Sequence, residues 1–294
     1  MDRLDAMRLF VRVVEMGSFS AVANQLNVAR SVVTRQVAAL EAHLGTKLLA
    51  RSTRRLTLTS AGTLYLEKCR VILNLVDAAE TDVAEDRGTP RGAIRLSLPL
   101  IYGVKRLAPL LLAFAEQHPE VELSMDFSDR RAKLVEEGID LSIRITRRLE
   151  PNDIVRKLGT CRLLAVAAPD YLLRHGRPKH PAELAGHECL GYRQDTGSQP
   201  WTFEADGRMQ DFFVPIRLDA SNGEVLAGAA LLGMGITLQP DFIVASHMAD
   251  GHLEQVLADF ATPELGIYAV LPSNRHVPYR VRRLIEFLAE RLGA

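Results

Sequence analysis

Short polar and basic side chains gather on one predicted helix, which runs from about Ala29 to Leu44. Arginine, serine, threonine and glutamine can hydrogen-bond base edges in the major groove of DNA as well as phosphate oxygens. The candidates on this helix are Arg30, Ser31, Val32, Thr34, Arg35 and Gln36. The alternative is the polar outer face of a small helical bundle.

A second basic group favours the DNA-binding interpretation. Arg51, Arg54 and Arg55 lie between two short apolar runs, residues 48–49 and 56–58, which predict a two-stranded wing. Arginines on such a hairpin can contact the minor groove or the flanking phosphates.

Three short helices are expected before the wing, with a helix-turn-helix at about residues 19–38. Apolar residues recur at helical spacing up to Val14, and Gly17 ends the first helix as a C-cap. Ser18 or Ser20 can cap the second helix with its hydroxyl. The third helix packs through an apolar face formed by Val33, Val37, Leu40 and Leu44.

One long helix without proline is predicted from about Ser60 to Arg87. Apolar residues along it are spaced alternately three and four positions apart, which is typical of a coiled-coil seam. They are Cys69, Ile72, Val76, Ala79 and Val83. The alternative is an amphipathic helix packed on its own domain. Because Gly and Pro follow at 88–92 as a hinge, we expect a dimerising linker over residues 61–88.

Strands and helices alternate beyond this linker, which predicts open α/β sheets. About 200 residues suffice for two lobes with a ligand cleft at the ends of their strands. We expect a domain at 89–294, with one lobe at about 92–145 and 266–294 and the other at about 160–262. The chain is expected to cross between the lobes near Arg144–Arg147.

The net charge of zero hides an uneven distribution. Residues 1–60 carry nine Lys+Arg against four Asp+Glu, a net of +5, and residues 61–294 carry 27 against 32, a net of −5. Such asymmetry indicates a nucleic-acid partner for the basic part. The sequence has no apolar run of about 18 residues that would predict a membrane span. Its charged start does not resemble a secretory signal, so the cytoplasm is the expected location.

A longer ordered pattern runs through the first 62 positions. Its members are Met7-Arg8-Leu9-Phe10, Gly17-Ser18-Phe19-Ser20-Ala21-Val22-Ala23, Leu26-Asn27-Val28, Ser31-Val32-Val33-Thr34-Arg35-Gln36-Val37, Leu40-Glu41, Leu44-Gly45, Leu48-Leu49, Arg51 and Leu58-Thr59-Ser60-Ala61-Gly62. Further members are Leu98-Pro99, Tyr102-Gly103, His118-Pro119, Glu137-Gly138-Ile139-Asp140-Leu141 and Ala168-Pro169-Asp170-Tyr171-Leu172. Through this set the chain resembles the LysR-type transcriptional regulators over its full length.

The resemblance implies a multidomain protein with a winged helix-turn-helix at 1–60, a linker helix and a two-lobed α/β effector domain similar to periplasmic binding proteins. It implies sequence-specific binding or bending of double-stranded promoter DNA, modulated by a small-molecule effector in the cleft between the lobes. It further implies a homo-oligomer, as a dimer of dimers, with RNA polymerase as a partner.

Matching positions imply an effector site. Its candidate residues are Pro99, Leu100, Ile101, Thr146, Asn222 and Thr237. The helix that starts at 221–223 offers free N–H groups to a carboxylate, although Asn222 can equally serve only as its cap. The segment 98–101 is more apolar than the Ser/Thr-rich version of many family members, which favours an aromatic or larger apolar effector.

The recognition helix departs from the family pattern at its start. Ala29-Arg30-Ser31 stands where family members often have Ser-Gln-Pro or Ser-Gln-Ser. Loss of the capping serine costs about 1 kcal/mol. Because Arg30 adds a long cation, we hypothesise that base preference at the positions read by this residue differs from the family norm.

Other chemistries are weaker. The sequence holds no GxSxG, HExxH or P-loop motif, so neither an enzyme nor a cofactor is expected. His175, His180 and His187 lack metal-ligand spacing. A redox sensor using Cys161 and Cys189 and a nonspecific architectural DNA binder remain alternatives.

Overall fold

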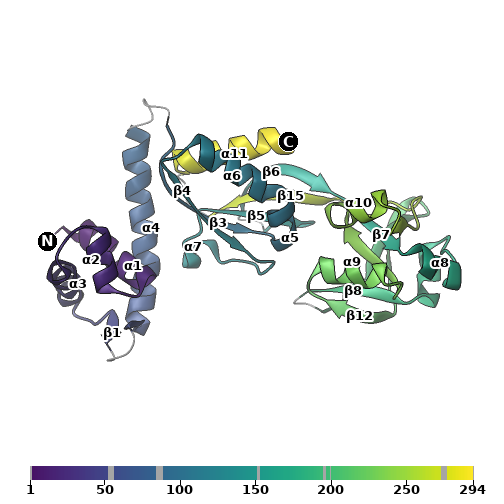
Figure 1. Ribbon diagram of the computed structural model, residues 1–294, viewed down its shortest axis with the longest axis horizontal. Coiled ribbons are helices and arrows are strands. Elements are labelled where there is room, and N and C mark those ends of the chain that lie inside the picture. The colour runs from purple at the N-terminus through teal and green to yellow at the C-terminus, as the bar shows by residue number, and fades with distance from the viewer. Residues whose placement is uncertain are drawn as a thin grey trace.

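Three parts follow one another in the computed structural model (Figure 1): a helical N-terminal unit, one long helix and two α/β lobes. The structure describes residues 2–51, 56–83, 89–150, 153–194, 197–198, 200–272 and 277–293. None of the described helices has the length and hydropathy needed to cross a membrane.

The N-terminal unit is a winged helix-turn-helix. Its elements are α1 (Arg3–Met16), α2 (Phe19–Gln25), α3 (Arg30–Leu44), β1 (Leu49–Arg51) and β2 (Leu56–Leu58). The caps agree with the sequence: Gly17 ends α1 at φ 61°, in the left-handed region, and the Ser18 hydroxyl accepts from the N–H of Ala21 at 3.2 Å. The turn before α3 passes through Asn27, also left-handed at φ 53°.

The long helix α4 (Ser60–Val83) packs on the N-terminal unit along one face. Leu66, Cys69 and Leu73 of this face are buried in the same core as Phe10 of α1. The prediction that Cys69 lies in the coiled-coil seam is therefore wrong. Helix α4 carries two apolar stripes, and Cys69 belongs to the inner one, which packs on the N-terminal core. The outer stripe exposes apolar side chains at Leu64, Ile72 and Leu75.

The first lobe is a five-stranded mixed sheet. Its strands, in order across the sheet, are β4 (Val121–Phe127), β3 (Gly92–Leu98), β5 (Leu141–Thr146), β15 (Leu265–Leu271) and β6 (Ile154–Cys161). Its helical segments are α5 (Leu100–Tyr102), the π-helical turn η2 (Gly103–Leu107), α6 (Ala108–Gln117), α7 (Leu134–Glu137) and α11 (Tyr279–Leu292). Strand β3 is parallel to β4 and β5, whereas β15 is antiparallel to β5 and β6. Helices α6 and α11 meet through the rings of Phe114 and Phe287, 5.2 Å apart.

The second lobe has its own mixed sheet. Its strands are β12 (Ile216–Ala220), β8 (Cys189–Gln194), β13 (Ile236–Pro240), β7 (Leu163–Ala167) and β14 (Glu254–Gln255), with β9 (Gly197–Ser198) beside β8. A separate hairpin consists of β10 (Trp201–Ala205) and β11 (Arg208–Phe212). Its helices are α8 (Pro169–His175), the 3-10 helix η3 (Pro181–Gly186), α9 (Gly223–Leu231) and α10 (Asp241–Ala249).

The chain crosses between the lobes at residues 161–163 and returns at 262–265. The expected crossover near Arg144–Arg147 is wrong, because β6 follows that segment and still pairs with β15 in the first sheet. At the true crossing the Thr262 hydroxyl donates to the carbonyl of Leu163 at 2.7 Å. The two connecting segments are thus bonded to each other.

A carboxylate joins the N-terminal unit to the first lobe. Glu15 of α1 accepts from Arg70 of α4, with an N–O distance of 3.4 Å, and from Arg95 of β3. Burial, and then the charge of Arg95, lower the pKa of Arg70. The Arg70 side chain also lies against Gly138, where a Cβ would come within 2.9 Å of it. Glu15 therefore holds together two cations that would otherwise repel.

The three cysteines lie in three different cores. Cys69 belongs to the N-terminal core, Cys161 to the core of the first lobe and Cys189 to that of the second. Burial raises the pKa of Cys69 to about 11 and the pKa values of Cys161 and Cys189 to about 12. Because the thiolate is the reactive form, none of these thiols is activated for redox chemistry.

Replacing Glu15 by glutamine should loosen the contact between α1, α4 and β3. Two ion pairs are lost, and because each contributes on the order of 1 kcal/mol, the two together contribute about 1–2 kcal/mol. We expect the first unfolding transition in scanning calorimetry to move down by a few degrees, because a loss of about 1 kcal/mol lowers the melting temperature of a small domain by several degrees. Asp5→Asn, which removes a carboxylate from the exposed face of α1, is the matched control. An identical first transition in Glu15→Gln would contradict the role given to this contact.

The native protein should resist thiol reagents. All three cysteines should react with a chromogenic disulfide only at the rate of unfolding, and denatured chains should release three equivalents. Peptide mass spectrometry after peroxide treatment should find no disulfide between Cys161 and Cys189. Recovery of that disulfide from folded protein would restore the redox-sensor alternative.

Candidate functional site

Helix α3 exposes the predicted DNA-binding side chains. Arg30, Ser31 and Arg35 are exposed, and Val32, Thr34 and Gln36 are half-buried. The opposite face is fully buried through Val33, Val37 and Leu40. The apolar spacing of the sequence thus fixes which way the polar face points.

The two arginines of this face have no partner among the described residues. Within the described part of the chain, neither Arg30 nor Arg35 makes a hydrogen bond or ion pair. Ala29 precedes α3 in an extended conformation with no side-chain capping bond, as the missing serine predicts. A long cation at an uncapped helix N-terminus is placed to meet an anionic partner.

The wing is only partly described. Strands β1 and β2 are antiparallel, pairing Leu49 with Leu58 and Arg51 with Leu56, which confirms the expected hairpin strands. Arg51 ends β1, but its side chain, together with Arg54 and Arg55, lies outside the described residues. Their DNA contacts stay a prediction.

Glu41 is a further functional candidate, which the sequence did not single out because it is not a group expected to contact DNA. Its carboxylate is 5% exposed and accepts from the N–H groups of Leu48 and Leu49, at 3.0 and 3.1 Å, and from Lys47 Nζ at 2.7 Å. Burial alone would raise the pKa of Glu41, but the bonds from Lys47, Leu49 and Leu48 outweigh it and the net pKa is lowered. The only sequence signal was the Leu40-Glu41 pair of the family pattern.

The predicted effector residues Pro99 and Leu100 begin the helix after β3. The N–H of Leu100 donates to Oδ1 of Asp129 at 3.0 Å, so the chain's own carboxylate occupies this helix start. Burial and the nearby Asp129 charge raise the pKa of Tyr192, a residue of the second lobe. Asp129 thus binds within the first lobe and acts electrostatically on a tyrosine of the second.

Several side chains bring the lobes into contact at this place. Ile101 packs against the apolar core of the second lobe, and the rings of Tyr102 and Phe242 meet edge-on, 5.0 Å apart. Lys105 Nζ, in η2, pairs with Oε1 of Glu224, in the first turn of α9, at 2.6 Å. Nothing in the sequence linked positions 105 and 224.

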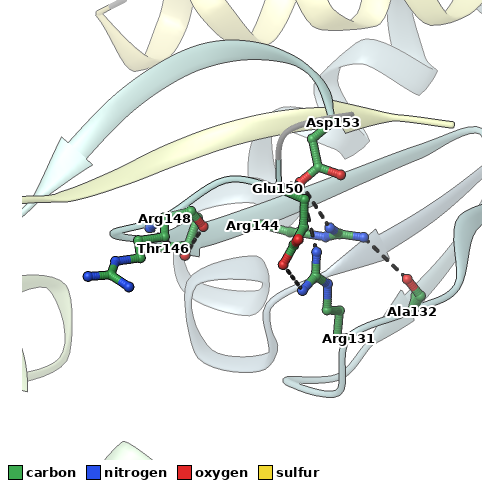
Figure 2. Close-up of polar contacts among 7 residues, drawn as sticks. All are labelled: Arg131, Ala132, Arg144, Thr146, Arg148, Glu150 and Asp153. Atoms are coloured by element: carbon green, nitrogen blue, oxygen red, sulfur yellow. Dashed lines mark hydrogen bonds and ion pairs between the residues drawn. The ribbon is translucent and has the colours of Figure 1, made fainter. Parts of the chain in front are cut away.

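Thr146 uses its hydroxyl within its own turn. The hydroxyl donates to the carbonyl of Arg148 at 2.8 Å and accepts from the Arg148 N–H at 3.1 Å. Figure 2 shows this turn apart from a charged group formed by Arg131, Arg144, Glu150 and Asp153. Beside Thr146, Arg147 reaches the second lobe by donating to the Thr202 hydroxyl at 3.4 Å.

Asn222 and Thr237 are engaged inside the second lobe. Asn222 Oδ1 caps α9 by accepting from Glu224 N at 2.9 Å and Val225 N at 3.4 Å, as the capping alternative predicted. Thr237 is fully buried; its hydroxyl donates to the carbonyl of Leu190 and accepts from Gln239. The structure thus brings Ile101 and Arg147 to the other lobe, whereas Thr237 lies behind the surface.

Metal binding finds no support in the described residues. They hold no cluster of three or more His, Cys, Asp or Glu side chains that could bind an ion. His187 instead accepts from or donates to the Tyr171 hydroxyl at 3.2 Å, and His175 stacks on the Tyr171 ring.

Family models match both halves of the chain. Residues 4–63 match the bacterial regulatory helix-turn-helix protein of the lysR family, and residues 87–293 match the LysR substrate binding domain.

Curated relatives and solved structures agree with these matches. An HTH-type transcriptional regulator of Xanthomonas campestris pv. campestris (strain 8004) is 36% identical over 289 residues, covering 97% of this chain and 84% of that protein. The regulator CrgA of Neisseria meningitidis serogroup C (strain 8013) is 35% identical over 290 residues, covering 98% and 97%. The CrgA structure superposes with a TM-score of 0.62 at 35% identity, covering 99% of each chain. The structure of the full-length Vibrio cholerae virulence activator AphB superposes with a TM-score of 0.59 at 30% identity, covering 98% of each chain.

These relatives are regulators and not enzymes. The chain therefore belongs to the LysR family of DNA-binding transcriptional regulators, with a helix-turn-helix at its N-terminus and an effector-binding domain after it.

Proposed function

We propose that this protein binds specific promoter sequences and that a small molecule held between its two lobes modulates the binding or bending of that DNA. The observation that carries the proposal is the outward polar face of α3, whose arginines have no partner within the described chain. We place the functional boundaries at 1–60, 61–88 and 89–294.

Different side chains of α3 make different contacts with DNA. Arg30 and Arg35 pair with guanine edges or phosphates, and Ser31, Thr34 and Gln36 hydrogen-bond other bases or the backbone. Val32 supplies an apolar contact to a thymine methyl group. The wing arginines Arg51, Arg54 and Arg55 bind the minor groove or flanking phosphates.

The effector binds where the lobes already touch. Pro99, Leu100 and Ile101 supply one wall, with Thr146 at the end of β5 and Asn222 in the second lobe. Thr237 lies behind this surface and supports it through its hydrogen bond to the carbonyl of Leu190. Because Ile101 and Phe242 offer apolar surface while Asp129 and Asn222 occupy the helix starts, an aromatic or larger apolar effector fits better than a small acid. A carboxylate on it would have to displace these groups.

Assembly follows from the outer stripe of α4. Leu64, Ile72 and Leu75 expose apolar side chains along one helix, a surface suited to a second copy of α4. We propose a dimer through this helix, a dimer of dimers on the promoter, and RNA polymerase as the downstream partner in the cytoplasm.

Arg30→Gln should change base preference. In a binding selection from random duplex DNA, we expect the preferred base to change at the position that residue 30 reads in each half-site. Loss of a bidentate contact costs about 1–3 kcal/mol, which is roughly 5- to 150-fold in Kd. Arg208→Gln, an exposed arginine of the second lobe, is the control. An unaltered preference for Arg30→Gln would refute the specificity role.

Aromatic and larger apolar compounds should stabilise the protein in a thermal-shift screen. At a ligand concentration of about 100 Kd the stabilisation is roughly 2.7 kcal/mol. Ile101→Asp places a charge in the apolar contact and should abolish the shift while leaving DNA affinity without ligand unchanged. Stabilisation by small polar acids alone would count against this effector class.

A further inference from the structure

The root of the wing is a short segment, Lys47–Leu49, that leads from α3 into β1. Its backbone N–H groups at Leu48 and Leu49 both donate to the same oxygen, Oε1 of Glu41. The other oxygen, Oε2, accepts from Lys47, whose ammonium is largely exposed. One side chain of the recognition helix therefore binds three consecutive residues at the wing root.

A buried carboxylate is a costly way to make such a joint. Taking an isolated carboxylate out of water costs several kcal/mol unless charged and polar groups compensate it. Here two N–H groups and a lysine compensate Glu41, and its pKa is lowered despite burial. An apolar residue at this position would fill the same space without fixing the direction of the segment.

The same segment is held from the other side by the start of α4. The Thr59 hydroxyl donates to the carbonyl of Lys47 at 2.7 Å, and the Thr59 N–H donates to the carbonyl of Leu48 at 3.0 Å. A Cβ at Gly62 would lie 2.0 Å from that Leu48 oxygen, so only glycine permits this approach. The wing root is therefore clamped between the recognition helix and the linker helix.

We propose that Glu41 is a positioning residue for DNA binding, which sets the angle of the wing so that the wing arginines and α3 engage the same stretch of DNA. The inference rests on the proposed contact between wing and DNA. Arg51 lies two residues beyond Leu49, about 7 Å along the strand. A rotation of roughly 10° at the root moves it by about 1 Å, enough to break a hydrogen bond whose working range is about 0.5 Å.

The test measures the salt dependence of DNA affinity in the full-length protein, with a duplex selected by the wild-type protein. The slope of log K against log salt is about −0.9 per phosphate contact. Glu41→Ala leaves two N–H groups without their acceptor. We expect its salt slope to show the loss of as many phosphate contacts as in the wing variant Arg51→Ala/Arg54→Ala/Arg55→Ala. Combining the two should cause no further loss, because both act through the wing.

The slope separates positioning from folding. Partial unfolding to an extent that does not depend on salt lowers the apparent affinity by one factor at every salt concentration and leaves the slope unchanged, and circular dichroism at each salt concentration measures that extent. Asp5→Ala removes one carboxylate from the same unit and should retain the wild-type slope. Glu41→Gln, which keeps one oxygen for the two N–H groups, carries the test if the alanine variant does not fold; a loss of at least about one contact is expected.

Two results would overturn the inference and are distinguishable. A folded Glu41 variant with the wild-type slope, beside a wing variant with a reduced slope, shows that the wing binds DNA without needing Glu41. A wing variant that itself keeps the wild-type slope refutes the proposed wing contact and, with it, the role of Glu41.

Discussion

The peptide segment at Lys47–Leu49 is the constraint on which the DNA-binding unit depends. Glu41 binds its N–H groups from α3, and Thr59 binds its carbonyl groups from the start of α4. Recognition helix, wing and linker helix therefore meet at three residues. The apolar core fixes the helices and also includes Leu49, with Leu56 and Leu58 packed against it. The joint adds directional hydrogen bonds at the wing root to this packing.

This joint gives a structural reason why several residues belong to the family pattern. Four members of the pattern form the joint: Glu41 supplies the acceptor, Leu48 the bound backbone, Thr59 the donor and Gly62 the close approach. The pattern also includes Ser31, Thr34, Arg35 and Gln36 on the outer face of α3, whereas at Arg30 this chain departs from it. The shared pattern thus holds residues that orient the wing as well as residues proposed to contact DNA.

Helix ends could be predicted from the sequence, whereas contacts between segments far apart in the chain could not. Gly17, Ser18 and Asn222 cap their helices because the chemistry lies within three residues of each end. The crossing was wrongly expected near Arg144–Arg147 because the place of β6 depends on its pairing with β15, more than 100 residues further along the chain. The two apolar stripes of α4 likewise look equivalent in sequence, and only contact with α1 assigns Cys69 to the inner one. At the site, spacing placed the α3 face correctly but could not pair Lys105 with Glu224.

The attachment of the DNA-binding unit decides what an effector can change. Among the described ion pairs, Glu15 ties α1 to α4 and to β3 of the first lobe, whereas Lys105–Glu224 ties the first lobe to the second. A ligand that alters only the Lys105–Glu224 contact moves the second lobe relative to the rest of the protein. That rest consists of the N-terminal unit, α4 and the first lobe. Such a movement reaches DNA through a neighbouring copy or by loosening the contacts that join α1 and α4 to the first lobe, the Glu15 bonds among them. These bonds are weak enough to be switched: a carboxylate 34% exposed contributes on the order of 1 kcal/mol per pair, no more than the roughly 1–3 kcal/mol by which one ligand typically changes the binding of another.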